Sequence, residues 1–180
     1  MKIKKETLFL RRMTGADIEA CYAIECDQKG QLWSKESFFS ELETALSEGY
    51  VLQRGERIVG FYFGWHIHGE SSLNNIVVKR MERGCGYGRI LLTHFLQRSL
   101  LHGSEELFLE VSVHNTVAVK LYESVGFHKV ALRKNYYALT HEDAFVMKKE
   151  QKIVAKRPYS AKEVWENEGR TLRKERLCTN

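Results

Sequence analysis

The chain alternates between short stretches with an apolar residue at every second position and longer stretches with apolar residues at helical spacing. The first pattern is typical of a half-buried β-strand, and the second of an amphipathic helix. Residues 106–113 alternate almost strictly, whereas residues 88–101 carry a broad apolar face that must pack on a sheet. These patterns predict strands at 7–12, 50–53, 57–67, 73–79, 106–113, 127–137 and 144–149, and helices at 15–26, 34–49, 88–101 and 115–126.

Polar and glycine residues at the segment boundaries support this division. Ser34 and Asn115 each precede an amphipathic run and are typical N-cap residues. Gly49 and Gly126 follow the two runs and are expected to end these helices. The second of the two helices is expected to bury one stripe, which comprises Val117, Leu121 and Val125, with Ala118 and Tyr122 beside it.

Composition limits the class of protein. Hydrophobic residues make up 43% of the 180 residues and charged residues 28%, so the chain can form a core. No apolar run approaches the roughly 18–20 residues of a membrane span, and residues 1–14 lack the apolar region of a signal peptide. The four cysteines form no C-x-x-C pair and show no metal-ligand spacing. We therefore expect a cytoplasmic protein that has no membrane contact.

The positive charge is concentrated after the predicted domain. From residue 151 onward the chain has eight Lys/Arg and four Glu, which gives +4 of the net charge of +5. The lone Pro158 lies in this region, and residues 160–163 (Ser-Ala-Lys-Glu) have the form of a capping box. We expect one α/β domain at 1–150 and a basic extension at 151–180, which is helical or simply solvated. An anionic partner such as ribosomal RNA is the alternative reason for its charge.

The strongest motif lies between a strand and a helix. Residues 77–92 read VVKRMERGCGYGRILL, with alternate glycines at Gly84, Gly86 and Gly88. Glycine allows close backbone approach to an anion, and a helix N-terminus presents unpaired N–H donors, so the segment predicts a pyrophosphate site. The dinucleotide-binding fingerprint fails because Arg89 and Leu91 stand where it needs glycine, and no P-loop motif exists. Spacing alone is also compatible with a flexible turn.

Residues 83–88 (Arg-Gly-Cys-Gly-Tyr-Gly) resemble the R/Q-x-x-G-x-G/A motif of the GNAT superfamily of N-acetyltransferases, which binds the pyrophosphate of acetyl-CoA. The similarity continues through LEVSVHNTVAVKLYESVGF at 109–127 and through 133–149, and it covers about residues 6–149. The combination resembles the RimI-type branch, which acetylates the N-terminal alanine of a small-subunit ribosomal protein. It implies an α/β fold with a mixed, mostly antiparallel sheet of about seven strands, flanked by about four helices and splayed at the acetyl-CoA site.

The resemblance also assigns acetyl-CoA contacts to particular residues. It implies a side-chain contact from Asn115 and backbone contacts from Ile76, Val77 and Val78. The implied phosphate contacts come from Arg83, Gly84, Cys85, Gly86, Tyr87, Gly88 and Arg89. Two departures stand out: Cys85 replaces a residue that is often basic in this branch, and Lys79-Arg80 replace a common Asp-Pro.

By the same resemblance, Glu110 is the general base and Tyr122 the general acid of acetyl transfer. A carboxylate in mid-strand between apolar neighbours is unusual, although either residue alone could be structural. Trp33 and Tyr136 are candidates for the peptide groove, with simple packing as the alternative. His66 and His68 share one face of a predicted strand, but two histidines without a third ligand predict no metal site.

The sequence thus favours an acetyltransferase that acts on the N-terminus of a ribosomal protein. One alternative is a GNAT enzyme for another N-terminus or for a small amine such as a polyamine or an aminoglycoside. An alternative of another class is an acetyl-CoA-binding, ribosome-associated module with little turnover. The presence of both Glu110 and Tyr122 argues against that module.

Overall fold

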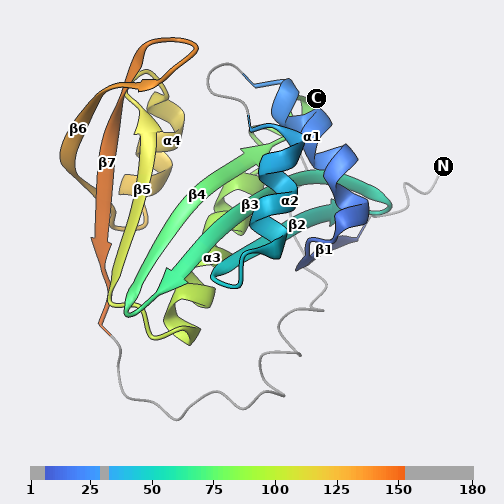
Figure 1. Cartoon of the computed structure of the whole chain (residues 1–180), viewed down its shortest axis with the longest axis horizontal. Coiled ribbons are helices and arrows are strands. Elements are labelled where there is room, and N and C mark those ends of the chain that lie inside the picture. Colours follow the sequence, from blue (N-terminus) through green and yellow to red (C-terminus); the bar gives the residue numbers. More distant parts are fainter. Residues whose placement is uncertain (1–6, 29–32, 153–180) are drawn as a thin grey trace.

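The computed structural model of the protein describes residues 7–28 and 33–152. Its centre is one seven-stranded sheet with the order β1-β2-β3-β4-β5-β7-β6 (Figure 1). The neighbours β4 and β5 are parallel, and all other neighbours are antiparallel. The strands are β1 Leu8–Arg12, β2 Ser47–Arg54, β3 Arg57–Ile67, β4 Glu70–Val78, β5 Glu106–Ser112, β6 His128–Tyr137 and β7 Glu142–Glu150. The mixed, mostly antiparallel sheet predicted from the sequence is confirmed.

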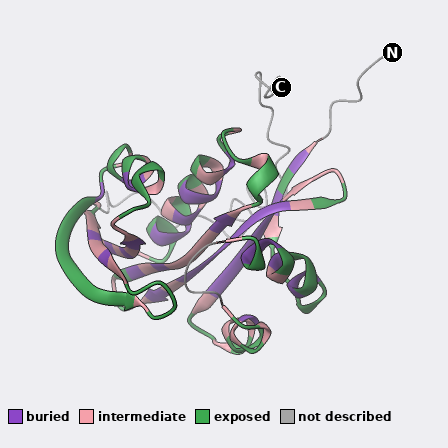
Figure 2. Ribbon diagram, turned by 90° about the horizontal axis from the view of Figure 1, so that it is seen from above, coloured by how far each residue is buried: buried purple, intermediate pink, exposed green. Residues whose placement is uncertain are grey.

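Helices cover both faces of this sheet (Figures 1 and 2). On one face lie α1 (Ile18–Cys26) and α2 (Lys35–Glu43), and on the other lie α3 (Tyr87–Leu101) and α4 (Thr116–Glu123). Two short 3-10 turns, Gly15–Asp17 and Arg80–Glu82, join helices to strands. The four predicted helices are therefore present in the described residues.

Alternation along β3 divides the core between the two faces. Phe61 and Phe63 are fully buried and pack beneath α1 and α2, where both contact Phe38. Tyr62 points to the opposite face and packs against Phe95 of α3. Because successive side chains of a strand point to opposite faces, one apolar strand supplies both cores. Such a strand must lie in the middle of the sheet, with helices on both sides.

Two sequence predictions about the helices are wrong. Helix α2 ends at Glu43 rather than at Gly49, which lies inside β2, where a Cβ would meet the Phe63 ring at 2.6 Å. Residues 47–49 pair with β3 as part of a strand, so they cannot continue the helix. Leu46, which was expected on the apolar face of the helix, is about half exposed. In α4 the predicted stripe is wrong only in part: Leu121 and Val125 pack against the core, but Val117 is 80% exposed, and the buried residues are Val119 and Tyr122. The buried face is therefore displaced around the helix.

Strands β4 and β5 pair along only part of their length. Their pairs run from Glu70 with Glu106 to Leu73 with Leu109, and they stop there. At the same point the register of β3 with β4 shifts, which leaves Asn74 as an extra residue on β4. Such a bulge bends a strand and raises its twist. The bulge therefore coincides with the place where β4 diverges from β5 (Figure 1).

A buried charge network lies near the C-terminal end of α3. Glu48 of β2 accepts two hydrogen bonds from Arg98, at 2.9 and 2.8 Å, and one from Arg12 at 2.5 Å. Burial alone would raise the pKa of Glu48, but hydrogen bonds from His102 and Arg98, with His66 at 3.6 Å, hold it far below its usual range. The pair of Glu48 and Arg98 ties α3 to the sheet at this end of the helix.

Of the basic extension predicted at 151–180, only residues 151 and 152 are described, so the helix considered near Pro158 lies outside the described residues. Among the helices that the structure describes, none combines the length and apolar character needed to cross a membrane.

Candidate active site

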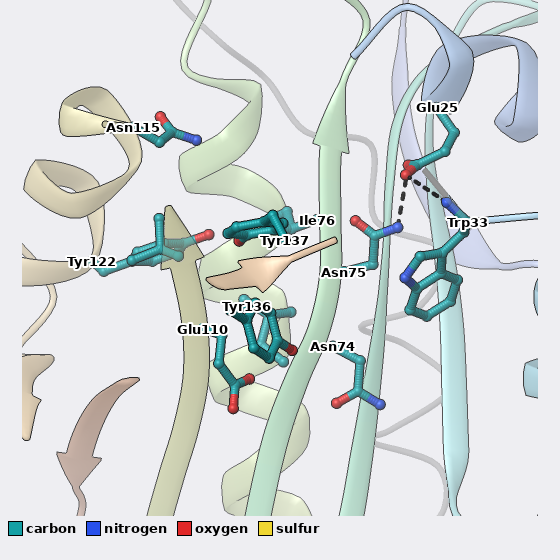
Figure 3. A pocket seen from close by; sticks show the side chains of 12 residues that line it. Glu25, Trp33, Asn74, Asn75, Ile76, Glu110, Asn115, Tyr122, Tyr136 and Tyr137 are labelled. Carbon is teal, nitrogen blue, oxygen red and sulfur yellow. Dashed lines mark hydrogen bonds between the residues drawn. The ribbon is translucent and has the colours of Figure 1, made fainter. Parts of the chain in front are cut away.

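A cavity of about 170 Å³ opens where β4 and β5 diverge (Figure 3). Its wall is formed by strands β4 and β5, helices α1 and α4, the end of β6, and Trp33 before α2. Its lining residues are Glu25, Trp33, Leu73, Asn74, Asn75, Ile76, Glu110, Val111, Asn115, Tyr122, Tyr136 and Tyr137. The structure therefore brings together both predicted catalytic residues and four other predicted site residues: Trp33, Ile76, Asn115 and Tyr136.

Glu110 lies one residue beyond the last pair between β4 and β5, which ends at Leu109. The alternation of β5 buries Leu109 and Val111 on one face and turns Glu110 to the other. Its carboxylate Oε1 is 3.0 Å from Nη1 of Arg133 in β6, whose side chain is about half exposed. Glu110 is thus a cavity carboxylate that is paired with a half-exposed cation.

Tyr122 reaches the cavity from α4, with its ring in edge contact with Phe127 at 6.1 Å between centroids. The residue is only 5% exposed, and burial raises the pKa of its hydroxyl well above the usual value. The proton therefore stays on the oxygen at neutral pH, which suits a proton donor. The residue is both a core residue of α4 and part of the cavity wall.

Asn115 fixes the beginning of α4 beside the cavity. Its Oδ1 accepts a hydrogen bond from the backbone N of Ala118 at 3.2 Å, as an N-cap residue does. This contact occupies one side-chain oxygen and leaves the amide nitrogen at the cavity wall (Figure 3). The predicted cap is confirmed.

The glycine loop lies beside the cavity lining rather than within it. Gly84 and Gly86 have φ values of 77° and 76°, so both occupy the left-handed region that favours glycine. Gly86 is the N-cap of α3, and the first helical hydrogen bond runs from Ile90 N to Gly86 O at 3.2 Å. The amides at 87, 88 and 89 therefore have no carbonyl partner within the helix and form a ready anion site.

Side chains of this loop have separate roles. Tyr87 is 3% exposed and points into the core, so only its backbone is placed to meet a phosphate. Arg83 donates to Val78 O and to Gln28 Oε1, and Arg89 donates to Ser124 Oγ at 3.0 Å. Cys85 packs against the core cluster. The predicted phosphate contacts therefore lie on one turn, although the cavity lining does not include them.

Of the other predicted backbone contacts, only Ile76 lines the cavity. Val77 is buried beneath α1 and α2, while Val78 packs toward α3 and α4. Both belong to the part of β4 that has no strand partner on the β5 side. Backbone groups of successive strand residues face opposite edges, and Val77 O faces Gly60 of β3, so Ile76 and Val78 rather than Val77 turn their backbone groups to the β5 side. Val78 O accepts there from Arg83 Nε at 3.4 Å.

Trp33 and Tyr136 occupy opposite walls of the cavity. The Trp33 ring packs on Phe38 and Phe63 at 5.8 and 5.3 Å between centroids, so packing and cavity lining coexist. Tyr136 is 36% exposed and lies against Tyr137 and below the Arg133 guanidinium. Both remain candidates for contact with a peptide.

The sequence analysis missed Glu25, which lines the cavity although it is only 3% exposed. Its carboxylate accepts hydrogen bonds from Trp33 N and from Asn75 Nδ2, both at 3.2 Å (Figure 3). Burial raises the pKa of Glu25, and these two bonds partly offset the rise. One signal was present in the sequence, namely a glutamate directly after Ile24 on the apolar stripe of the first helix.

The two histidines considered from the sequence do not share a strand face, because β3 ends at Ile67 and His68 lies in the following turn. Among the described residues, His66 instead meets Glu48 and His102, with ligand atoms within 4.8 Å of one another. Arg98 already occupies both Glu48 oxygens, and the two imidazoles are stacked in parallel rather than converging. The group therefore fits a metal ion poorly, and the expectation of no metal site stays a prediction.

Comparisons with known proteins agree with this geometry. A ribosomal protein bS18-alanine N-acetyltransferase of Salmonella typhimurium is 34% identical over 140 residues, which cover 75% of this chain and 92% of the relative. An enzyme with the same name from Escherichia coli K12 is 34% identical over 133 residues, which cover 73% and 89%. The crystal structure of the ribosomal-protein-S18-alanine N-acetyltransferase from Escherichia coli matches with a TM-score of 0.75 and 28% identity, covering 84% of this chain and 99% of that one.

The model of the acetyltransferase (GNAT) family matches residues 18–127, which is more than half of the chain. The splayed strands, the glycine loop and the Glu110 and Tyr122 cavity lie within or beside this matched region. The chain belongs to the acetyltransferase (GNAT) family and is an acetyl-CoA-dependent N-acetyltransferase.

Proposed function

We propose that this chain transfers the acetyl group of acetyl-CoA to the N-terminal alanine of a bS18-type small-subunit ribosomal protein. The relatives that carry this name are 34% identical and are matched over about nine tenths of their length. The observation that carries the proposal is the single cavity at the splay, which brings Glu110 and Tyr122 together from β5 and α4. An acyl transfer to an amine needs a proton acceptor and a proton donor, and this cavity holds one of each.

The residues present fit acetyl-CoA, which supplies the activated acetyl thioester. The amides at the start of α3, which precede the first helical hydrogen bond, suit its pyrophosphate, together with Arg83 and Arg89. The backbone groups of Ile76 and Val78 suit the extended pantetheine arm, because they offer strand-like hydrogen bonds on the side that β5 leaves open. Asn115 lines the cavity between these two regions and can reach the arm with its side-chain amide.

Glu110 and Tyr122 divide the proton transfers. The amine attacks the acetyl carbon, the new C–N bond forms, and the amine proton passes to Glu110 directly or through water. The C–S bond breaks, and Tyr122 gives its proton to the departing sulfur. Arg133 lies 3.0 Å from Glu110 and must yield part of this contact when the carboxylate accepts a proton.

Proton affinity favours an N-terminal amine over a lysine side chain. An α-amino group with a pKa of about 7.7–8.0 is roughly 10% neutral at pH 7. A lysine side chain with a pKa of about 10.4 is neutral in only about four molecules per ten thousand. Without a strong means of lowering the lysine pKa, the α-amine presents far more of the nucleophilic form.

The experiment measures free thiol from acetyl-CoA with peptides that begin Ala-Arg, Ser or Met. Parallel arms contain a polyamine, an aminoglycoside, or an N-terminally blocked peptide with one lysine. We expect the highest kcat/KM for the alanine peptide and no signal from the blocked one. A polyamine that exceeds every peptide would contradict the proposal, and so would tight acetyl-CoA binding without turnover on any amine. A further arm compares the rate at which the full-length enzyme and an enzyme truncated after Arg157 acetylate the intact 30S subunit. This comparison tests whether the basic extension contacts the ribosome.

A further inference from the structure

Glu25 is the one carboxylate in the cavity lining, among the described residues, that has no cationic partner. The other lining carboxylate, Glu110, is paired with Arg133 at 3.0 Å. Among the described residues, Glu25 contacts only neutral donors, which are the Trp33 backbone N–H and the Asn75 amide, each at 3.2 Å. The lining of the cavity in the described ranges 7–28 and 33–152 includes no lysine, arginine or histidine. Within that part of the chain, the Glu25 carboxylate thus lies in the cavity wall without a cation beside it.

The two hydrogen bonds alone do not explain a glutamate at this position. A glutamine side chain would accept from Trp33 N through its oxygen, and the Asn75 amide could turn to accept from its nitrogen. Glutamine would do so without a charge in a place that is 3% exposed. Burying a carboxylate next to neutral groups is costly, so the charge itself needs a reason. A cation that arrives with the substrate supplies that reason.

Glu25 also lies on the wall opposite Glu110, across the cavity at the splay (Figure 3). Glu25 belongs to α1, and its carboxylate accepts a hydrogen bond from the side-chain amide of Asn75 on β4. Asn75 directly follows the bulged residue Asn74, so the same irregularity that opens the strands also places this amide. A free peptide N-terminus is mostly an ammonium ion at neutral pH, since its pKa is about 7.7–8.0.

We propose that Glu25 binds the protonated α-ammonium group of the incoming peptide and thereby selects substrates with a free N-terminus. The inference rests on the proposed function and names the group of the substrate that the cavity recognises. Glu25 is then a positioning residue that captures the amine in its abundant, charged form. Proton removal and attack follow at Glu110, so Glu25 governs binding rather than the chemical step.

The test compares two peptides of identical sequence, one beginning with alanine and one beginning with a propionyl group in its place. The second lacks only the amino group. Binding of each is measured by calorimetry in the presence of CoA, where no turnover occurs, and the kinetics of the alanine peptide are measured with acetyl-CoA. The variants are Glu25→Gln, which keeps the shape, Glu25→Asp, which keeps the charge, and Glu19→Gln as control. Glu19 lies on the same helix, but its side chain is 78% exposed.

We expect the wild type and Glu19→Gln to bind the alanine peptide about tenfold or more tightly than the propionyl peptide at pH 7, in the range of one charge-assisted hydrogen bond. Glu25→Gln should bind both peptides alike and raise KM for the alanine peptide about tenfold, with kcat changed less than about threefold. Glu25→Asp should retain part of the discrimination. Above pH 9 the advantage of the wild type should shrink, because the amine is then neutral.

The inference is overturned if Glu25→Gln discriminates between the two peptides as the wild type does. It is equally overturned if Glu25→Gln and Glu25→Asp both lower kcat and the thermal midpoint together while discrimination persists, since that is the signature of a structural role. Failure of the proposed function looks different: the wild type then releases no thiol with any peptide. The binding comparison with CoA stays valid in that case.

Discussion

Replacing Tyr122 with phenylalanine removes a single oxygen atom that the fold does not use. The side chain is 5% exposed, its ring keeps the contact with Phe127, and no described residue hydrogen-bonds its hydroxyl. Deleting a buried hydroxyl that lacks a protein partner costs little or nothing. We therefore expect the free energy of unfolding to change by less than about 0.5 kcal/mol, which shifts the thermal midpoint by no more than about 2 °C.

The same deletion should be severe for catalysis. If Tyr122 is the general acid, its loss lowers kcat by about 10²–10⁴, the usual contribution of such a group. At about 1.36 kcal/mol for each factor of ten, the barrier rises by about 2.7–5.4 kcal/mol. The assay is the initial rate of thiol release at saturating acetyl-CoA and peptide, with the thermal midpoint measured on the same samples. Acetyl-CoA affinity should stay unchanged.

Tyr62→Phe is the matched control, because Tyr62 is fully buried and its hydroxyl lies 2.8 Å from Nδ1 of His94. Its loss breaks a hydrogen bond outside the cavity and should cost about 1 kcal/mol of stability with kcat unchanged. The two variants should thus show opposite patterns of stability and rate. A Tyr122→Phe enzyme that turns over within twofold of the wild type would refute the assignment of the acid.

Three further outcomes are expected. Gly88→Ala should raise the acetyl-CoA dissociation constant at least about tenfold with an unchanged thermal midpoint, since the new Cβ has ordinary space, at 3.4 Å from Leu121, but lies in the turn proposed to bind the pyrophosphate; calorimetry checks this. Arg133→Gln should lower kcat/KM for the peptide with acetyl-CoA affinity unchanged, because the Glu110 carboxylate loses the partner that holds it in the cavity; an unchanged kcat/KM would separate Arg133 from the chemistry. Burial lowers the pKa of His94 from 6.5 to about 4, so as pH falls its imidazole is protonated in the unfolded chain before it is protonated in the folded one. The free energy of unfolding should therefore decrease by up to about 3 kcal/mol between pH 6.5 and pH 4. Urea unfolding across this range checks the decrease, which should be absent in His94→Gln.

Local signals explain which parts of the site the sequence could predict. Ser34 and Asn115 each accept a hydrogen bond from the backbone amide three residues ahead. Because the two partners are close in sequence, the sequence alone predicts where each helix begins. The alternation of β5 placed Glu110 on the face opposite its buried neighbours. The left-handed conformations of Gly84 and Gly86 also follow from the residue type and from the helix that begins there.

The remaining features depend on contacts that no local pattern contains. Glu25 receives its hydrogen bond from Asn75, which is 50 residues away in sequence. Glu110 meets Arg133 across the intervening strand β7, through the register of β5 and β6 on that strand. The displaced stripe of α4 has a similar cause, since the sheet rather than the helix decides that Val119 is buried. Helical periodicity gives a stripe, but the neighbouring surface fixes which one packs.

The position of the N-terminal end of α3 depends on residues that carry no chemistry. A Cβ on Gly64 of β3 would approach Phe95 at 2.7 Å, and one on Gly60 would approach Val77 O at 2.7 Å and Leu91 at 3.0 Å. Both glycines therefore let the helix lie closer to the sheet than any larger residue allows. Arg98 fixes the far end of the same helix to Glu48. Because a helix is rigid over this length, these contacts also fix where its N-terminal end lies beside β4. Glycine in the middle of β3, which weakens a strand in isolation, is thus explained by the close approach of α3 to the sheet.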